Sequence, residues 1–375
     1  MISSKLKYGV VCLLSFVLFG GCVHEFPDEG ATVPFTLNIS FDTALPLYTV
    51  VDAGSRSDAA DYDIRYIVSV YPGAVGASKV DRTELYRFTF TKDNVATLDH
   101  SLTIDILPGE YTFLVWSDYV RAGSVDDLFY NTSDFQEIKL QGEHKGNTDF
   151  RDAFRGEAVA EVGYSSEPVE VAMERPLAKY NFISTDLSEF ITRVLALMEA
   201  REKKKAEEEQ IADAYGYSLS NEGADDEDGV GSDGSKSDGG LTDEGTKGET
   251  RVNLDSFTVV FSYSGSMPSS FNMFTNQPAD VSQGVEFSSK IKQIGETEAE
   301  LGFDYIFVNG NESLSSVRIT VYDEEGVEVS KTNPIEFPIV RSKLTTIRST
   351  FLTSIASEGV TVKPDFDGDH PYVVP

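Results

Sequence analysis

The chain has 375 residues, and its 62 acidic against 31 basic side chains give a net charge of −31. Phosphate contacts need clustered Lys and Arg, so this balance excludes nucleic acid as a partner, and an anionic membrane surface would repel the body of the protein. Two cysteines cannot supply a disulfide framework, so apolar cores must hold the folded part, and the length predicts two domains.

The chain begins with a basic start and an apolar run at 8–19 (YGVVCLLSFVLF). This run is long enough for a secretory signal and shorter than the roughly 20 residues of a membrane-spanning helix. Gly20, Gly21 and Cys22 follow it and resemble the lipobox of bacterial lipoproteins, in which the cysteine thiol receives a diacylglycerol. We therefore predict a lipoprotein signal peptide at 1–21 and lipidation of Cys22. The alternative is an ordinary signal peptide with a cysteine near its cleavage site.

Runs with strand character follow a short tether at 22–30. The first, at 32–43 (TVPFTLNISFDT), alternates apolar and polar residues with a period of two, which is typical of a half-buried strand. Pro108-Gly109 predicts a tight turn between two later runs. Strands at this spacing, without alternating helices, predict a β-sandwich at 31–172. The further runs lie at 64–72, 85–91, 100–108, 110–119, 135–140 and 167–176.

A second set of elements begins with a strand at 178–185 and continues into a predicted helix at about 187–212. Asp186 is the expected N-cap with Glu189 as its capping-box partner, and the apolar residues after it recur at helical spacing. This spacing favours a crossover helix packed on the sheet over an exposed partner-binding helix.

The segment at about 218–250 is almost entirely Gly, Ser and acidic residues. Such a composition buries too little apolar surface to offset the entropy of ordering, so it predicts a disordered acidic surface loop. Its DDEDG and SDGSKSDGG runs resemble calcium-binding loops, but they lack the alternating oxygen ligands closed by a bidentate Glu. We therefore favour a solvating insertion over a calcium site.

Strand patterns resume after this insertion and predict a second β-sandwich at 173–375. The DEEG stretch at 323–326 predicts a hairpin turn. The final stretch at 360–375 is rich in Pro, which suits an edge strand and not a central one. The other runs lie at 254–265, 284–291, 300–309, 314–326 and 333–352.

Motifs of catalysis are missing from the sequence. The four histidines, at 24, 100, 144 and 370, are scattered, and no nucleophile elbow, zinc-binding helix or phosphate-cradling loop occurs. Asp365, Asp367 and Asp369 could share one face of a strand and hold a metal, but a Pro-flanked acidic turn is the favoured interpretation. We therefore predict a protein that is not an enzyme and has no cofactor.

Four stretches together resemble the fimbrillin-like surface lipoproteins of Bacteroidales, a family of fimbrial stalk, anchor and tip subunits. They are the lipobox with CVHEFPDE, then LPGEYTFLVWSDY (107–119), VAMERPLAKYNFIST (171–185) and IVRSKLTTIRSTFLT…VKPDFDGD (339–369). In order and spacing they cover nearly the whole chain. The resemblance implies a mainly β protein with two tandem transthyretin-like antiparallel β-sandwich domains and a lipid-anchored place on the outer membrane, exposed at the cell surface. The acidic insertion departs from typical members.

The resemblance also implies partners and a mode of assembly. In stalk-forming members a protease cuts after an Arg or Lys and thereby removes the first strand. A strand of the next subunit then fills the groove that this strand leaves. Here 32–43 is the strand that would leave, and Arg56, within 53–65, is the candidate cleavage site; a plain loop arginine is the alternative. The partners would be other fimbrial subunits or further copies of this chain. Anchor, stalk and tip roles stay open, as does any host or bacterial surface ligand.

A surface glycan-binding lipoprotein of a polysaccharide-uptake system is the alternative function. Such proteins present exposed Trp and Tyr side chains to the sugar. Trp116 is expected in the core because it lies within a strand pattern, which leaves tyrosines such as Tyr130, Tyr263 or Tyr372 to supply a platform.

Overall fold

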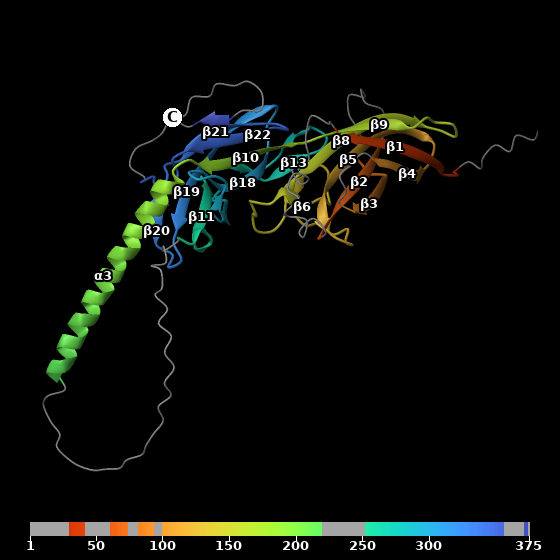
Figure 1. Ribbon diagram of the computed structural model, residues 1–375. Helices are drawn as coiled ribbons and strands as arrows, with labels where there is room; N and C mark the ends of the chain where they lie inside the picture. Colours follow the sequence, from red (N-terminus) through yellow and green to blue (C-terminus); the bar gives the residue numbers. More distant parts are fainter. Residues whose placement is uncertain are drawn as a thin grey trace, which may run out of the picture.

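The computed structural model describes residues 30–41, 61–73, 82–93, 100–219, 252–355 and 371–373. Figure 1 shows two β-rich halves that lie end to end, with one long helix projecting from the C-terminal half. The protein is mainly β, with several sheets, as the strand patterns predict.

Seven strands of the N-terminal half form one sheet in the order β3-β2-β5-β8-β9-β1-β4. Strand β1 pairs antiparallel with β4 and parallel with β9, so the sheet is mixed and not purely antiparallel as predicted. The strands are β1 (Val33–Phe41), β2 (Tyr62–Pro72), β3 (Tyr86–Asp93), β4 (His100–Ile106), β5 (Gly109–Arg121), β8 (Ala153–Val162) and β9 (Val169–Glu174).

This sheet closes over a core in which β1 and β4 face β2 and β5. The ring of Phe35 on β1 stacks on Phe113 of β5 with centroids 5.3 Å apart, and Phe41 meets Phe154 of β8 at 4.8 Å. The alternation predicted for the first strand is confirmed, since every second residue of β1 from Val33 to Ile39 is buried. Pro108 lies between β4 and β5, which do not pair, so the turn predicted there is a corner between facing layers and not a hairpin.

A second core joins the two halves. The outer faces of β2 and β5 carry Ile67, Leu114 and Trp116, which pack with Phe271 and Phe307 of the C-terminal half. Trp116 is fully buried, as expected, with its ring 5.4 Å from that of Tyr130. A small sheet also crosses between the halves, in which β7 pairs with β13. Its strands are β6 (Tyr130–Asn131), β7 (Ile138–Leu140), β13 (Ser270–Asn272) and β14 (Gln277–Pro278).

Two sheets enclose the core of the C-terminal half. Rings of Tyr180 and Phe182 on one sheet pack on Phe261 and Phe337 of the other at 4.9–5.7 Å. One sheet holds β10 (Leu177–Ser184), β17 (Lys292–Gln293), β18 (Ala299–Phe307), β22 (Leu344–Ser349) and β23 (Pro371–Val373). The other holds β11 (Thr258–Tyr263), β16 (Glu286–Ser289), β19 (Glu312–Tyr322), β20 (Glu328–Lys331) and β21 (Ile335–Val340), and β12 (Met267–Pro268) pairs with β15 (Val281–Ser282) beside them. Single 3-10 turns lie at η2 (Asp149–Arg151) and η3 (Leu254–Ser256).

Two sequence predictions for this half are confirmed. The hairpin at 323–326 joins β19 to β20, closed by a hydrogen bond from the amide of Gly326 to the carbonyl of Asp323, and Gly326 has the positive φ of 76° that favours glycine. Strand β23 lies at a sheet edge and pairs only with β22 in the described part, as the Pro-rich stretch predicts. Residues 360–370 of that stretch lie outside the described residues.

The helix α3 (Leu187–Leu219) extends beyond the predicted end at 212. Leu187, Phe190 and Val194 pack into the C-terminal core. Residues 196–212 are exposed; Arg201 still pairs with Asp323 at 2.7 Å, and the helix beyond it projects from the body (Figure 1). The expected capping box does not form, because the carboxylate of Asp186 instead accepts hydrogen bonds from the amide and hydroxyl of Thr353 at 2.8 and 2.6 Å. No helix in the ranges that the structure describes is long and apolar enough to cross a membrane. Residues 220–250 of the predicted acidic loop lie outside those ranges.

Candidate functional site

The site residues predicted from the sequence all lie outside the described residues. These are Cys22, Arg56, Asp365, Asp367 and Asp369. Lipidation, cleavage and metal binding at these positions therefore stay predictions. Within the described ranges, no three His, Cys, Asp or Glu side chains gather in a way that could hold a metal ion.

The strand that the family resemblance marks for removal, β1, lies inside its sheet. Seven residue pairs join it to β4 and five join it to β9. Leu37 is completely buried, and Phe35 and Ile39 are each 2% exposed. In the described part of the chain β4 has β1 as its only partner, so β1 connects β4 to the rest of the sheet.

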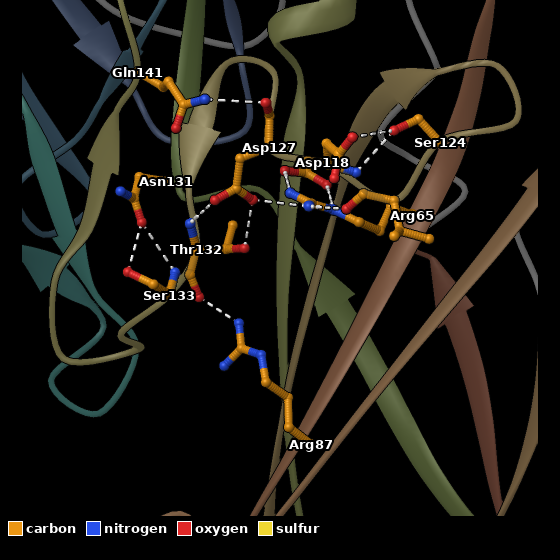
Figure 2. Close-up of polar contacts among 11 residues, drawn as sticks. Arg65, Arg87, Asp118, Ser124, Asp127, Asn131, Thr132, Ser133 and Gln141 are labelled. Atoms are coloured by element: carbon orange, nitrogen blue, oxygen red, sulfur yellow. Dashed lines mark hydrogen bonds and ion pairs between the residues drawn. The ribbon is translucent and has the colours of Figure 1, made fainter.

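A buried arginine organises the loop that follows β5 (Figure 2). Arg65 on β2 donates to both carboxylate oxygens of Asp118 at 2.9 and 2.7 Å, and Asp118 is only 1% exposed. The third side-chain nitrogen of Arg65, Nη1, donates to the carboxylate of Asp127 and to the carbonyl of Val125, both at 2.8 Å. Burial raises the pKa of Asp118, and the paired guanidinium opposes that rise. Arg65 therefore ties the start of the loop to the sheet.

Asp127 continues this network along the loop. Its carboxylate accepts from the amide and hydroxyl of Thr132 at 3.0 and 2.8 Å, and its carbonyl accepts from Nε2 of Gln141 at 3.0 Å (Figure 2). Arg87 donates to the carbonyl of Thr132 and lies over the ring of Phe135, 4.8 Å from its centroid. The loop between β5 and β7 is thus fixed at several points.

Phe129 of this loop, together with residues 140–145 and Arg151, forms one wall of a cavity of about 330 Å³ between the two halves of the protein. The opposite wall comes from the segments around β12, β15 and the start of β16. The lining includes Phe129, Gln141, His144 and Arg151 from the N-terminal half and Ser269 and Ser282 from the C-terminal half. We call it the interdomain pocket.

Charged groups from both halves meet beside the interdomain pocket, where its lining residues His144 and Arg151 contact a buried carboxylate. Asp304 on β18 contacts Nη1 of Arg151, Nε2 of His144 and the hydroxyl of Tyr263, each at 2.6 Å. Burial raises the pKa of Asp304, but Arg151 and His144 outweigh it, so this pKa lies below its ordinary value. The carboxylate is thus ionised, and Nη1 of Arg151 also lies 2.9 Å from Nε2 of His144, so the three side chains form one compact cluster.

No spacing signal in the sequence brings these three residues together. His144 and Arg151 lie in a mostly polar stretch, and Asp304 comes from a strand more than 150 residues later. The one available signal is a charged residue inside the apolar pattern FDYIF, because a charge there needs a buried partner.

A second buried ion pair clamps the passage between the halves. The Nε of Arg175 donates to both oxygens of Asp152 at 2.8 Å, and its guanidinium lies 4.8 Å from the ring centroid of Phe154. The carbonyl of Arg175 accepts from Nε of Arg341 at 2.9 Å. Arg175 therefore holds to both halves at once, and at 1% exposure it is hidden from solvent.

We predict that Asp152 titrates well above the usual range for an aspartate. Burial raises its pKa from 3.8 to about 6, although Arg175 opposes the rise. Because the folded-state pKa lies above the unfolded one, this carboxyl stabilises the fold below about pH 4, and that contribution is lost as the pH rises through about 6. Between pH 5 and 7 its share of the unfolding free energy should fall by about 1 kcal/mol.

The measurement is an NMR titration of the Asp152 side-chain carboxyl carbon, assigned by its disappearance in Asp152→Asn. A midpoint near the ordinary aspartate value would contradict the prediction.

The tyrosine platform considered for glycan binding is wrong for two of its three members. Tyr130 is fully buried and Tyr263 is 7% exposed, because both rings belong to packed cores. The side chain of Tyr372 lies outside the described residues. His100, at the start of β4, lies 5.9 Å from the ring of Tyr66.

Several solved structures resemble this chain loosely. The fimbrial anchor protein Mfa2 from Porphyromonas gingivalis is 11% identical, with 80% of this chain and 81% of that chain covered at a TM-score of 0.35. A fimbrial assembly protein from Parabacteroides distasonis is 12% identical, with 84% and 90% covered at 0.35. A candidate polysaccharide-binding protein (DUF1812) from Bacteroides thetaiotaomicron is 9% identical, with 80% and 79% covered at 0.40. TM-scores this low assign neither a fold nor a function to this chain.

Comparison at the level of sequence gives one family. No curated protein matches the chain. A family profile matches residues 28–375, which is nearly the whole sequence and includes both halves, the helix and the strand β1. The chain therefore belongs to the family of unknown function DUF6562.

Proposed function

We propose that this chain is a non-catalytic, lipid-anchored subunit of a surface fibre, with tandem transthyretin-like halves at 31–172 and 173–375. The position of β1 carries the proposal, because this strand fills a slot between β4 and β9 that a strand from another subunit could occupy. The sequence resemblance to fimbrillin-like lipoproteins supports the same function. Cys22 would hold the chain in the outer membrane.

The slot around β1 has the properties that strand exchange needs. A replacement strand must satisfy two hydrogen-bond ladders and supply apolar side chains at alternate positions. Burying the four apolar side chains from Val33 to Ile39 contributes roughly 6–12 kcal/mol, at about 1.5–3 kcal/mol each. That is comparable with the whole stability of a typical domain. A chain that lost β1 would therefore need a donor strand to keep this half folded.

Two fates follow for the chain at the cell surface. If a protease cuts after Arg56, β1 leaves with the lipid anchor, the slot opens and the remainder polymerises through donor strands. If the chain is not cut, it keeps its own β1 and serves as an anchor or accessory subunit in adhesion. Its partners are then the subunits that attach to it.

The test is the intact mass and N-terminal sequence of the protein taken from its native outer membrane. A triacylated Cys22 at the start means an uncut anchor or accessory subunit, and a start at Ser57 means a polymerising subunit. An Arg56→Ala variant is the control, since it should abolish the Ser57 start and leave lipidation unchanged. An N-terminus elsewhere without lipid would overturn the proposal.

A further inference from the structure

We propose that the interdomain pocket binds a carboxylate-bearing sugar ring, such as a uronate. The site does not depend on whether β1 is exchanged. It brings together a cavity between the halves, a buried arginine with unused donors, and a mixed wall of apolar and hydroxyl groups.

Size restricts the ligand first. The cavity of about 330 Å³ lies at the small end of the roughly 300–1,000 Å³ range of small-molecule sites. It therefore suits one ring and not an extended polymer segment. Because its walls come from both halves, a ring inside it would contact both at once.

Arg151 supplies the specific chemistry. Its side chain is 3% exposed, and among the residues that the structure describes all three of its side-chain contacts leave from Nη1. The Nε–H and the two Nη2–H donors are unused in these contacts, and the Nε–H and one of the Nη2–H bonds lie side by side on one edge of the guanidinium. That edge matches a carboxylate, which accepts two parallel hydrogen bonds. Asp304 holds the guanidinium in place from the opposite side.

The rest of the lining suits a sugar ring. Gln141, Ser269 and Ser282 offer an amide and two hydroxyls, which can bond to ring hydroxyl groups. The ring of Phe129 gives an apolar surface on which the C–H face of a sugar can lie. Phe129 belongs to the loop that Arg65 and Asp127 fix in place, and Gln141, just after β7, donates to the carbonyl of Asp127, so both side chains are positioned before the ligand arrives (Figure 2).

The net negative charge of the chain repels anions, so binding of a carboxylate depends on its direct contact with Arg151. The chain carries −31, and Glu143 and Glu286 also line the pocket. Long-range attraction of an acidic ligand is therefore absent, and the site has to select through short-range hydrogen bonds to Arg151. Salt should consequently weaken binding little, because screening acts on long-range repulsion as well as on the contact.

The experiment is calorimetric titration of the detergent-solubilised full chain with D-galacturonic acid and with D-galactose. The two sugars differ only in carrying a carboxylate or a hydroxymethyl group. We expect saturable binding of galacturonic acid and at least tenfold weaker binding of galactose. Equal binding of both sugars, or no saturation with galacturonic acid up to ~10 mM, would overturn the proposal.

Two variants place the binding in the pocket. Ser282→Trp should abolish binding by filling the cavity, whereas Gln283→Trp, on the exposed neighbour that does not line the cavity, should leave it unchanged. Arg151→Lys keeps the charge next to Asp304 but removes the two-donor edge, so affinity for galacturonic acid should fall about tenfold. Thermal melts show which variants are folded. Unchanged binding by Ser282→Trp, or tighter binding of a short acidic peptide than of the sugar, would contradict the assignment.

Discussion

Replacing Arg65 by methionine should lower the free energy of unfolding by about 3–5 kcal/mol. The substitution keeps the apolar stem but leaves the carboxylate of Asp118 buried without its partner, and breaking a buried pair from one side costs the desolvation of the remaining charge. It also releases Asp127 and the carbonyl of Val125, so the loop beside the interdomain pocket should loosen. Urea denaturation followed by circular dichroism measures the loss.

Arg82→Met is the matched control for this prediction. Arg82 is exposed; among the described residues it donates to Gln136 at 3.2 Å, and its guanidinium lies 5.1 Å from the ring centroid of Phe274, so its loss should cost about 1 kcal/mol or less. The double variant Arg65→Met with Asp118→Leu should recover part of the stability, because both charges are then gone. Equal costs for Arg65→Met and Arg82→Met would show that the buried network contributes nothing special.

Placing aspartate at Leu37 should cost about 4–5 kcal/mol or more and open the N-terminal sheet. Leu37 is completely buried and faces the core from the middle of β1, among the apolar side chains of the hydrophobic cluster. An aspartate there either carries an unpaired buried charge or stays protonated with a raised pKa, and both states cost free energy of folding. Because β1 alone connects β4 to the sheet in the described part, β4 should be released with it. Hydrogen exchange of the β4 amides reports this release.

Thr36→Asp is the control in the adjacent position. Thr36 faces outward and bonds the hydroxyl of Thr103 at 3.1 Å, so its replacement should cost no more than about 1 kcal/mol. The contrast tests the alternation of β1 directly. Slow β4 exchange in Leu37→Asp, as slow as in Thr36→Asp, would mean that the sheet tolerates a displaced β1.

Half-buried strands were predictable because the alternation of apolar and polar side chains can be recognised from consecutive residues alone. The 32–43 pattern needs only the period of two, and the hairpin at 323–326 only its turn residues. Strand β8 was not predicted from the sequence, because Gly156, Ala158 and Ala160 are small and have little β-propensity. The structure explains the glycine, since a Cβ at Gly156 would lie 2.5 Å from the sulfur of Met173 on β9. A larger side chain at position 156 is therefore excluded by a residue on another strand, which no local sequence pattern reveals.

The core between the halves was not predictable for a similar reason. Strand β5 is buried on both faces, so its run EYTFLVWSDY indicates burial without saying which element covers the second face. The cluster of His144, Arg151 and Asp304 was even less predictable. These residues come together only when β18 lies against the loop before η2. Sequence patterns report a residue's own strand, whereas these roles come from contacts between strands.

The parallel pairing of β1 with β9 determines how this half responds to mechanical force. A pull on the chain ahead of Val33 acts along the axis of β1, so it loads the ladders to β4 and β9 in shear. In shear, all the hydrogen bonds of a ladder bear tension together, whereas a peeled edge strand breaks them one after another. A strand in this slot should therefore resist sudden traction far better than its modest length suggests.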